Sequence, residues 1–330
     1  MFKRNIKISG IGTYVPNRTV YSSEIDSLIG AKSGWSERKS GVKKRYFVTD
    51  ETASFMGAEA AKRAIEDASI KLEEVDCIVS GSGTMEQAIP CNAALIQKQL
   101  GLQHSGVPSF DVNSTCLSFL TALDMISYAI ESGRFQNVLI VSSEIASVGL
   151  NWKQDESSIL FGDGAVAVVV SKSNGQSKII SSHMETYSVG AHLSEIRGGG
   201  TKLHPREYSE QKKEDFLFDM DGKAIFKLSY KIMPTFINKL FKDTNLAMDD
   251  IKMVIPHQAS ASAMRIIRKK LGVNEDSFMT IIENYGNMIA ASIPMALFES
   301  IKQGKVQRGD KVLFLGTSAG LSIGGIILEY

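Results

Sequence analysis

The chain has 330 residues, of which 43% are hydrophobic and 22% charged, so it is globular in composition and long enough for one large unit or two fused domains. Its 37 basic and 36 acidic residues leave a net charge of +1, which argues against nucleic-acid binding, since that needs an excess of Lys and Arg. The three cysteines form no CxxC pair and no cluster with histidine, which disfavours structural zinc or a disulfide framework and fits a reducing cytoplasm. No apolar run is long enough for a membrane span, and the N-terminal segment has the pattern of neither a signal peptide nor an anchor.

Strands and helices are predicted to alternate along the chain. In the first half, the periodicity predicts strands at 5–14, 75–80, 110–112, 137–142 and 165–171, and helices at 52–68, 93–100 and 117–132. In the second half, it predicts helices at 224–243, 261–271 and 290–303, and strands at 253–256, 312–316 and 320–330. The polar stretch 172–215 is interpreted as a connection or insertion.

Two similar segments suggest an internal duplication. FGDGAVAVVVSK closes the first half and SAGLSIGGIILEY closes the second, and each joins a turn of small residues to an apolar strand. The predicted boundary lies near residue 172, which gives an N-terminal half of 1–172 and a C-terminal half of 173–330. Chance similarity of the two segments is the alternative. The alternation itself predicts an α/β architecture whose sheets are mainly covered by helices.

Cys116 lies between a short strand and a long helix, in DVNSTCLSFLTALDMI, with Ser114 and Thr115 as candidate N-cap residues. The free amides and dipole of a helix start favour negative charge, so a thiol placed there is expected to ionise near neutral pH and act as a nucleophile. A buried structural cysteine is the alternative. Cys77, inside the strand VDCIVS, is expected to pack in the core.

Two further polar residues stand in contexts that suit a site. His257 directly follows a buried strand, in VIPHQAS, where a side chain is well placed for the floor of a cleft. Asn287 lies in ENYGNMIAASIPMAL, where Gly286 permits a tight bend and the following small residues allow a close helix approach. Taken singly, His257 is more often a hydrogen-bonded structural group and Asn287 a helix cap, so both alternatives stay open at this point.

Together these segments make the chain resemble β-ketoacyl-acyl-carrier-protein synthase III, a condensing enzyme of the thiolase superfamily, over nearly its whole length. The motifs DVNSTCLSFLTAL, VIPHQAS and YGNMIAASIPMAL follow the order of the family, and FGDGAVAVVV and the final Gly-rich strand also match. The resemblance implies an internally duplicated five-layer αβαβα fold, a homodimer and a catalytic triad of Cys116, His257 and Asn287. It also implies an acyl-CoA or acyl-carrier primer and a malonyl thioester, in fatty-acid, polyketide or other secondary lipid synthesis, without metal or redox cofactor.

The implied chemistry suits these residue types. Cys116 would take the acyl group while its own backbone amide, with that of Ala319 or Gly320, holds the oxyanion. His257 and Asn287 would then donate hydrogen bonds to the malonyl thioester oxygen during decarboxylation. The alternative activity is that of a same-fold acyltransferase, which passes the acyl group to an oxygen or nitrogen nucleophile without decarboxylation. A non-catalytic partner subunit is disfavoured because all three triad residues are present.

The residues expected around the thioester arm depart from the pattern of the family. Trp35 matches a tryptophan that stacks near the CoA adenine, whereas Lys39 and Asp155 stand where arginines are expected. Because lysine offers a point charge instead of a bidentate contact, phosphate recognition is weakened. Delivery of the primer by a carrier protein, or as another thioester, is then favoured. Three further positions complete this set: Lys223 and Ser260, each in place of an asparagine, and Ser262, in place of an arginine.

The helix AMRIIRKKLG matches the carrier-docking surface of the family. A local basic patch attracts an acidic carrier protein even when the net charge of the chain is close to zero. The implied docking residues are Lys227, Arg265, Arg268, Lys269 and Lys270.

The acyl pocket is also atypical. In the family, a large aromatic residue of the partner subunit caps this pocket, and Ile89 stands at that place here. Because isoleucine is smaller, we expect primers longer than acetyl. Thr317 replaces an aromatic near the oxyanion strand, and GNMIAAS replaces the common GNTSAAS, so the pocket is less typical of housekeeping fatty-acid initiation.

Overall fold

The computed structural model describes residues 3–330. The first sheet consists of β1 (Ile6–Tyr14), β4 (Cys77–Ser80), β5 (Ser109–Asp111), β6 (Asn137–Glu144) and β7 (Gly164–Lys172), in the order β1-β7-β6-β4-β5. The second sheet consists of β8 (Lys178–Thr186), β11 (Met253–Pro256), β12 (Lys311–Ser318) and β13 (Ser322–Glu329), in the order β11-β12-β13-β8. The two sheets take their strands from opposite sides of the predicted boundary at residue 172, while the internal duplication itself stays a prediction.

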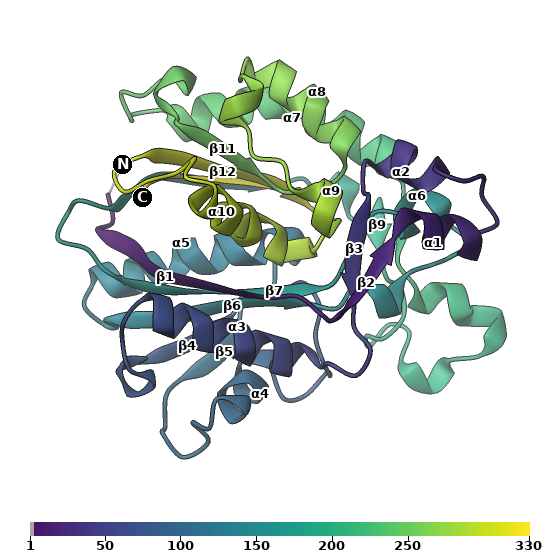
Figure 1. The fold of residues 1–330 in the computed structure, drawn as a ribbon, viewed down its shortest axis with the longest axis horizontal. Helices are drawn as coiled ribbons and strands as arrows, with labels where there is room; N and C mark the ends of the chain where they lie inside the picture. Colours follow the sequence, from purple (N-terminus) through teal and green to yellow (C-terminus); the bar gives the residue numbers. More distant parts are fainter. Residues whose placement is uncertain (1–2) are drawn as a thin grey trace.

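Six longer helices complete five layers (Figure 1). They are α3 (Ala53–Asp67), α4 (Asn92–Gln99), α5 (Ser118–Glu131), α7 (Gly222–Phe241), α8 (Ala261–Leu271) and α10 (Ser292–Lys302). Helices α3 and α4 cover the outer face of the first sheet, α7 and α8 cover that of the second, and α5 and α10 lie between the sheets. This arrangement confirms the predicted five-layer αβαβα fold of the thiolase type.

Shorter elements line the side of the molecule where α2 and α6 are labelled in Figure 1. They are β2 (Arg18–Tyr21), α1 (Ser22–Leu28), α2 (Trp35–Ser40), β3 (Lys44–Phe47), α6 (Asp155–Ser158), β9 (Ser194–Glu195), β10 (Asp219–Met220) and α9 (Ile282–Tyr285). Two 3-10 turns, η2 (Thr115–Leu117) and η9 (Ile289–Ala291), precede α5 and α10. Among residues 3–330, no helix combines the length and apolar character that crossing a membrane requires.

The apolar run of β7 shows why the sheets are stable in this arrangement. Its alternate side chains face opposite layers, since successive residues of a strand point to opposite faces. Val166, Val168 and Val170 join the core between the two sheets, while Ala165, Ala167 and Val169 join the core under α3 and α4. Each of these valines is at most 1% exposed, and full burial of such a side chain contributes roughly 1.5–3 kcal/mol.

The interpretation of 172–215 as a connection is wrong for its first part. Residues 178–186 form β8, which pairs antiparallel with β13. The hydrophobic periodicity did not predict this strand because its centre is polar. These polar side chains form hydrogen bonds with other parts of the chain. The Oγ of Ser181 donates to the carbonyl oxygen of Leu240 at 2.6 Å, and the Oγ of Ser182 accepts from Nη2 of the buried Arg4 at 2.9 Å.

Candidate active site

Cys116 lies in η2, between β5 and α5. Thr115 has a φ of 51°, which a β-branched residue rarely adopts, so the turn must be held by its contacts. The backbone amide of Ser114 donates to the Oγ of Ser118 at 2.9 Å, and that hydroxyl donates to the carbonyl oxygen of Thr115 at 2.6 Å. The predicted capping by Ser114 and Thr115 is therefore wrong, because Ser118 closes the turn in their place.

The environment of the thiol also differs from the expectation. Desolvation by burial, together with the charge of Glu144, raises the pKa of the Cys116 thiol to about 12. Hydrogen bonds from the backbone amides of Ala319 and of Cys116 itself act in the opposite direction. A low pKa was expected from the helix start, but η2 separates the sulfur from α5 and desolvation dominates. Cys116 is therefore a thiol near pH 7, and it would have to lose its proton in order to attack a substrate.

His257 directly follows β11, as predicted, and its backbone amide donates to the carbonyl oxygen of Leu315 on β12 at 2.8 Å. Burial lowers the pKa of the imidazole to about 4, so the ring is neutral at pH 7. Its Nδ1 has no hydrogen-bond partner within residues 3–330. The neighbouring Gln258 is fully buried, and its Oε1 accepts from the amide of Ile281 at 2.9 Å. This bond ties the histidine segment to the segment that leads into Asn287.

Asn287 stands between α9 and η9, after the bend that the sequence predicted at Gly286. Gly286 has a φ of 67°, and an added Cβ would lie 2.7 Å from the carbonyl oxygen of Leu160, so only glycine fits there. The backbone amide of Asn287 donates to that same oxygen at 2.8 Å. Its Oδ1 accepts from the amide of Ile289 at 2.9 Å, which leaves the Nδ2 group as the one to donate to a substrate.

The structure brings these three segments together. The turn η2 contacts η9, which follows Asn287, and it also contacts β12, which pairs in parallel with β11 just before His257. Gly316 on β12 marks the closest approach, since a Cβ there would lie 2.9 Å from the Cβ of His257 and 3.1 Å from Cδ2 of Leu117. The segments of Cys116, His257 and Asn287 therefore meet at one place in the fold.

The remaining predicted pocket residues divide into two groups. Thr317 lies on β12, and Ala319 and Gly320 form the following turn, where Gly320 has a φ of 113°. These three residues are next to the cysteine turn, because the Oγ1 of Thr115 donates to the carbonyl oxygen of Ala319 at 3.5 Å. Ile89 is different: it is 84% exposed and closes no pocket within its own chain.

The predicted thioester-arm residues come from elements that adjoin one another. Trp35 begins α2 and packs on an apolar cluster, while Lys39 is exposed in the last turn of that helix. A Cβ on Gly41, at the end of α2, would lie 2.3 Å from the Cβ of Ala261, which places the start of α8 beside α2. Ser260 caps α8, since its Oγ accepts from the amide of Ala263 at 3.2 Å, so its hydroxyl is already engaged.

The other side of this region is formed by α6 and the start of α7. Asp155 begins α6, and Lys223 lies in the first turn of α7. A Cβ on Gly222 would lie 3.3 Å from Oε1 of Glu156, so these two helices are neighbours. With Asp155 and Glu156 at its start, α6 presents negative charge where the family pattern has an arginine.

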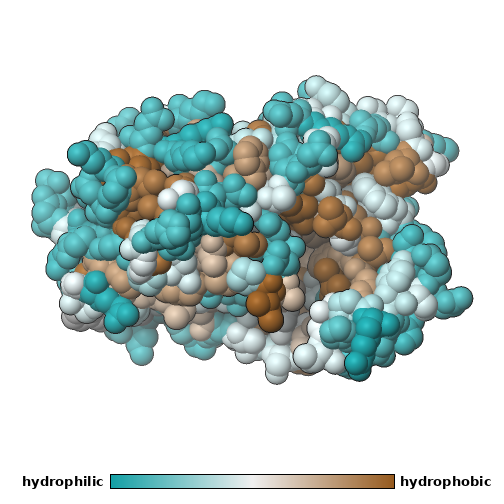
Figure 2. Space-filling model, turned by 90° about the horizontal axis from the view of Figure 1, so that it is seen from below, coloured by the Kyte–Doolittle hydropathy of each residue, from teal (hydrophilic) through white to brown (hydrophobic). Residues whose placement is uncertain are grey.

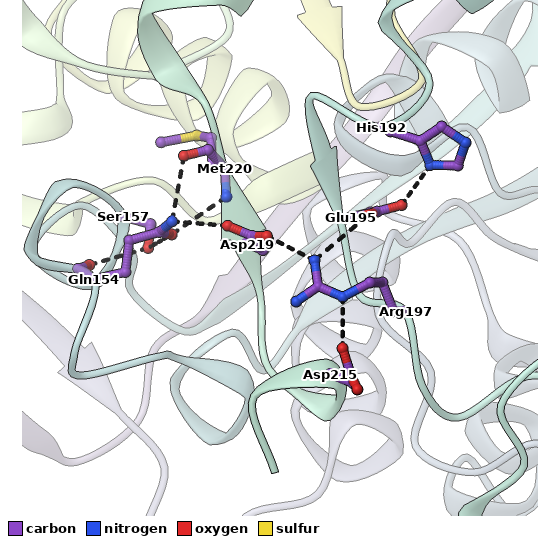
Figure 3. A network of polar contacts seen from close by, with 8 residues as sticks. All are labelled: Gln154, Ser157, His192, Glu195, Arg197, Asp215, Asp219 and Met220. Carbon is purple, nitrogen blue, oxygen red and sulfur yellow. Dashed lines mark hydrogen bonds and ion pairs between the residues drawn. The ribbon is translucent and has the colours of Figure 1, made fainter. Parts of the chain in front are cut away.

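A polar network connects α6 to the inserted segment (Figure 3). Arg197 is its centre: Nε donates to Asp215 at 2.7 Å and Nη1 to Asp219 at 2.6 Å. The second oxygen of Asp219 accepts from Nε2 of Gln154 at 2.8 Å, while His192 pairs with Glu195 on β9. The network thereby links β9, β10 and the residue before α6.

The predicted docking residues lie on α7 and α8, two helices that contain no acidic residue. Two of the five are engaged within the chain. Arg268 pairs with Glu275 at 3.2 Å, and Nζ of Lys270 lies 3.9 Å from the centre of the Tyr230 ring. The others in the set are Lys227, Arg265 and Lys269.

Sequence reasoning missed two buried polar residues at the site, Gln258 and Glu144. Both are 0% exposed, and both bind backbone amides of loops that carry site residues. Their signal in the sequence is a polar residue at the end of an apolar strand, in VIPHQ and NVLIVSSE. Because buried polar side chains need partners, such residues mark places where loops are tied to strands.

A five-layer αβαβα fold in which the segments of a Cys, a His and an Asn meet is that of a condensing acyltransferase of the thiolase type. Two family models match, that of 3-oxoacyl-[acyl-carrier-protein (ACP)] synthase III over residues 110–188 and that of its C-terminal part over residues 241–330. The chain belongs to the 3-oxoacyl-[acyl-carrier-protein] synthase III family.

Individual relatives agree over the full length. The β-ketoacyl-[acyl-carrier-protein] synthase III of Aquifex aeolicus is 33% identical over 324 residues, covering 98% of this chain and 99% of the relative. That of Clostridium acetobutylicum is 31% identical, covering 99% of both. The crystal structure of the Aquifex aeolicus enzyme has a TM-score of 0.89 with 98% of this chain and 100% of that chain covered, at 31% identity. The priming β-ketosynthase of the R1128 polyketide pathway has a TM-score of 0.89 at 27% identity, covering 99% of this chain and 96% of that one.

Proposed function

We propose that the protein loads an acyl primer on Cys116 and condenses it with a malonyl thioester, bound to acyl carrier protein, with loss of CO2. The observation that carries this proposal is the convergence of Cys116, His257 and Asn287, with two backbone amides directed at the sulfur. Such a reaction begins fatty-acid or polyketide chains. It needs no redox cofactor and no metal, which stays a prediction of the chemistry.

In the first step, the sulfur of Cys116 attacks the carbonyl carbon of the primer thioester. The amides of Cys116 and Ala319 stabilise the oxyanion that forms on the carbonyl oxygen. The bond between that carbon and the donor sulfur then breaks, and the donor leaves as a thiol with the proton that Cys116 has lost.

In the second step, the bond between the malonyl carboxylate and its α-carbon breaks and CO2 leaves. The electron pair moves to the thioester oxygen, where the N–H groups of His257 and Asn287 donate hydrogen bonds to the enolate. The α-carbon then attacks the acyl group on Cys116, and the carbon–sulfur bond to Cys116 breaks. The product is a β-ketoacyl thioester, and the sulfur of Cys116 leaves as a thiolate that takes a proton from water, which restores the thiol.

The test of this function is the release of CO2 with formation of a new carbon–carbon bond. Enzyme loaded with an acyl group and then given malonyl-carrier protein should yield one CO2 and one β-ketoacyl thioester for each acyl group consumed. An acyltransferase that only passes the acyl group to an oxygen or nitrogen nucleophile would release no CO2. Acyl transfer to such a nucleophile without CO2 would overturn the proposal.

We further propose that the carrier protein docks on the basic face of α7 and α8. The absence of acidic residues from these two helices supports an acidic partner. Lys227, Arg265 and Lys269 are the candidates for direct pairing, whereas Arg268 and Lys270 have contacts of their own. The negative start of α6, near Lys223, favours delivery of the primer by the carrier over recognition of a CoA phosphate.

We also propose a homodimer formed along β5, the open edge of the first sheet. Its Phe110 is 38% exposed, and the loop before α4 exposes Met85 and Ile89. Figure 2 shows the molecule from below, where apolar side chains gather around a hollow toward the side on which α2 and α6 lie in Figure 1. In such a dimer, each Ile89 would cap the acyl pocket of the partner.

Three free thiols support a cytoplasmic location.

The size of the Ile89 side chain predicts the length of the acyl primer that the enzyme prefers. Because Ile89 is smaller than an aromatic residue, primers longer than acetyl should load Cys116 faster than acetyl does. Loading rates for a series of acyl thioesters, followed by intact mass, check this expectation. The variant Ile89→Phe should restore preference for acetyl, whereas an acetyl preference in the unmodified enzyme would contradict the role given to Ile89.

A further inference from the structure

The reaction described above leaves one buried ionisable residue of the site without a role. Glu144 ends β6 and is 0% exposed. Its Oε1 accepts from the amide of Gly83 at 2.7 Å, and its Oε2 accepts from the amide and hydroxyl of Thr84 at 2.9 and 2.7 Å. A hydrogen bond from the amide of Ala290 also lowers the pKa of this carboxyl.

These partners belong to two loops of the site. Gly83 and Thr84 begin the loop that leads to Ile89, and Ala290 lies in η9, just after Asn287. Gly83 also touches the third loop, since a Cβ there would lie 3.2 Å from the carbonyl of Thr115, the residue before Cys116. The carboxyl group therefore lies where the pocket loop, η9 and η2 meet.

The bonding pattern matches a carboxylate. All of its partners are donors, and a carboxylate accepts such bonds without offering a proton of its own. Burial raises the pKa of Glu144 to about 7, whereas the donors favour the ionised form. Its charge is one of the two causes that raise the pKa of the Cys116 thiol.

Few other charged side chains lie near the carboxyl group of Glu144. Of the elements packed against the carboxyl group, η2 brings Cys116 and η9 brings no titratable side chain. The Gly83–Thr84 loop brings Glu86, whose Oε2 accepts from the amide of Ser54 at 2.7 Å. His257 is neutral. Asp163 precedes Gly164, which pairs with Glu144 in the sheet. Its carboxylate accepts hydrogen bonds from other donors: the amides of Val48, Ala146 and Ser147 and the hydroxyl of Ser147.

We propose that Glu144 is a positioning residue that ties the Gly83–Thr84 loop to η9 and holds a negative charge where these loops meet the turn of Cys116, so that the sulfur rests as a thiol. The inference rests on the proposed role of Cys116 as the nucleophile. The charge would protect the sulfur from alkylation and oxidation between turnovers, since these reactions require the thiolate.

The test is the pH dependence of alkylation of Cys116 by iodoacetamide in the complete chain, followed by intact mass. Glu144→Gln keeps the size of the side chain and removes its charge, so the midpoint of alkylation should fall by about one pH unit or more. Cys116→Ala gives the background from Cys77 and Cys91. A midpoint that coincides with that of the unmodified protein would overturn the proposed charge effect.

Two further variants separate charge from structure. Asp163→Asn removes a buried carboxylate that has the same number of donors, and the alkylation midpoint of Cys116 should not move in this variant. A shift equal to that of Glu144→Gln would mean that losing any buried carboxylate has this effect.

Glu144→Asp keeps the charge but has a shorter side chain, so the alkylation midpoint should stay while the rate of condensation falls roughly tenfold or more. Unchanged condensation in Glu144→Asp would overturn the positioning role. Because alkylation needs no thioester substrate, its outcome does not depend on whether the proposed condensation is correct.

Discussion

Replacing Cys116 with alanine should abolish the acyl-enzyme, so that no acyl thioester adds mass to the protein. Condensation should fall by about 10³-fold or more, because loss of a covalent nucleophile removes the step on which the others depend. The change removes one sulfur from a half-buried position in η2, and the turn is held by Ser118, so the fold should be retained. Intact-mass analysis after incubation with an acyl thioester measures the first effect directly.

Cys91→Ala is the matched control. Cys91 is also free and partly exposed, and it precedes α4 as Cys116 precedes α5. Its replacement should leave the rate of acylation within about twofold of the unmodified protein, as expected for a surface change away from the site. Acylation that persists in Cys116→Ala and disappears in Cys91→Ala would contradict the assignment of the nucleophile.

Much of the site could be predicted because three motifs lie far apart in the sequence yet must meet in this fold. The His257 motif follows a buried strand and the Asn287 motif follows a Gly bend, and the structure has both features. What links them could not be predicted. Gln258 and Glu144 are single polar residues at the ends of apolar strands, and their partners are backbone amides of distant loops, which the sequence pattern does not reveal.

The electrostatic state of Cys116 shows a second limit. Local sequence indicated a helix start and therefore a low pKa, but the value depends on how many other segments cover the sulfur. Desolvation and the charge of Glu144 reverse the expected direction. The polar strand β8 was missed for a related reason: its serines are satisfied by Arg4 and by a helix carbonyl, so their polarity does not indicate exposure.

His257→Ala and Asn287→Ala should both spare acylation of Cys116 and both remove decarboxylation of the malonyl thioester. Each side chain is placed to donate to the enolate oxygen, and loss of one such donor lowers the rate by about 10²–10³-fold. For Asn287 the structural reason is specific: its Oδ1 is held by the amide of Ile289, so only the Nδ2 group faces a substrate. Single-turnover acylation and CO2 release, measured on the same protein sample, separate the two steps.

Asn287→Asp is the sharper variant, because it keeps the size of the side chain and the bond to Ile289 while it replaces the donor with an acceptor. A carboxylate near the developing enolate would repel it, so CO2 release should fall at least as far as in Asn287→Ala.

The imidazole of His257 has a pKa of about 4, so it is neutral from pH 6 to 9. The rate of decarboxylation should therefore vary little with pH in that range. Loss of acylation in all three variants would contradict the division of roles between Cys116 and the other two residues. Loss of acylation in His257→Ala alone would instead show that the imidazole takes the proton of Cys116 during loading.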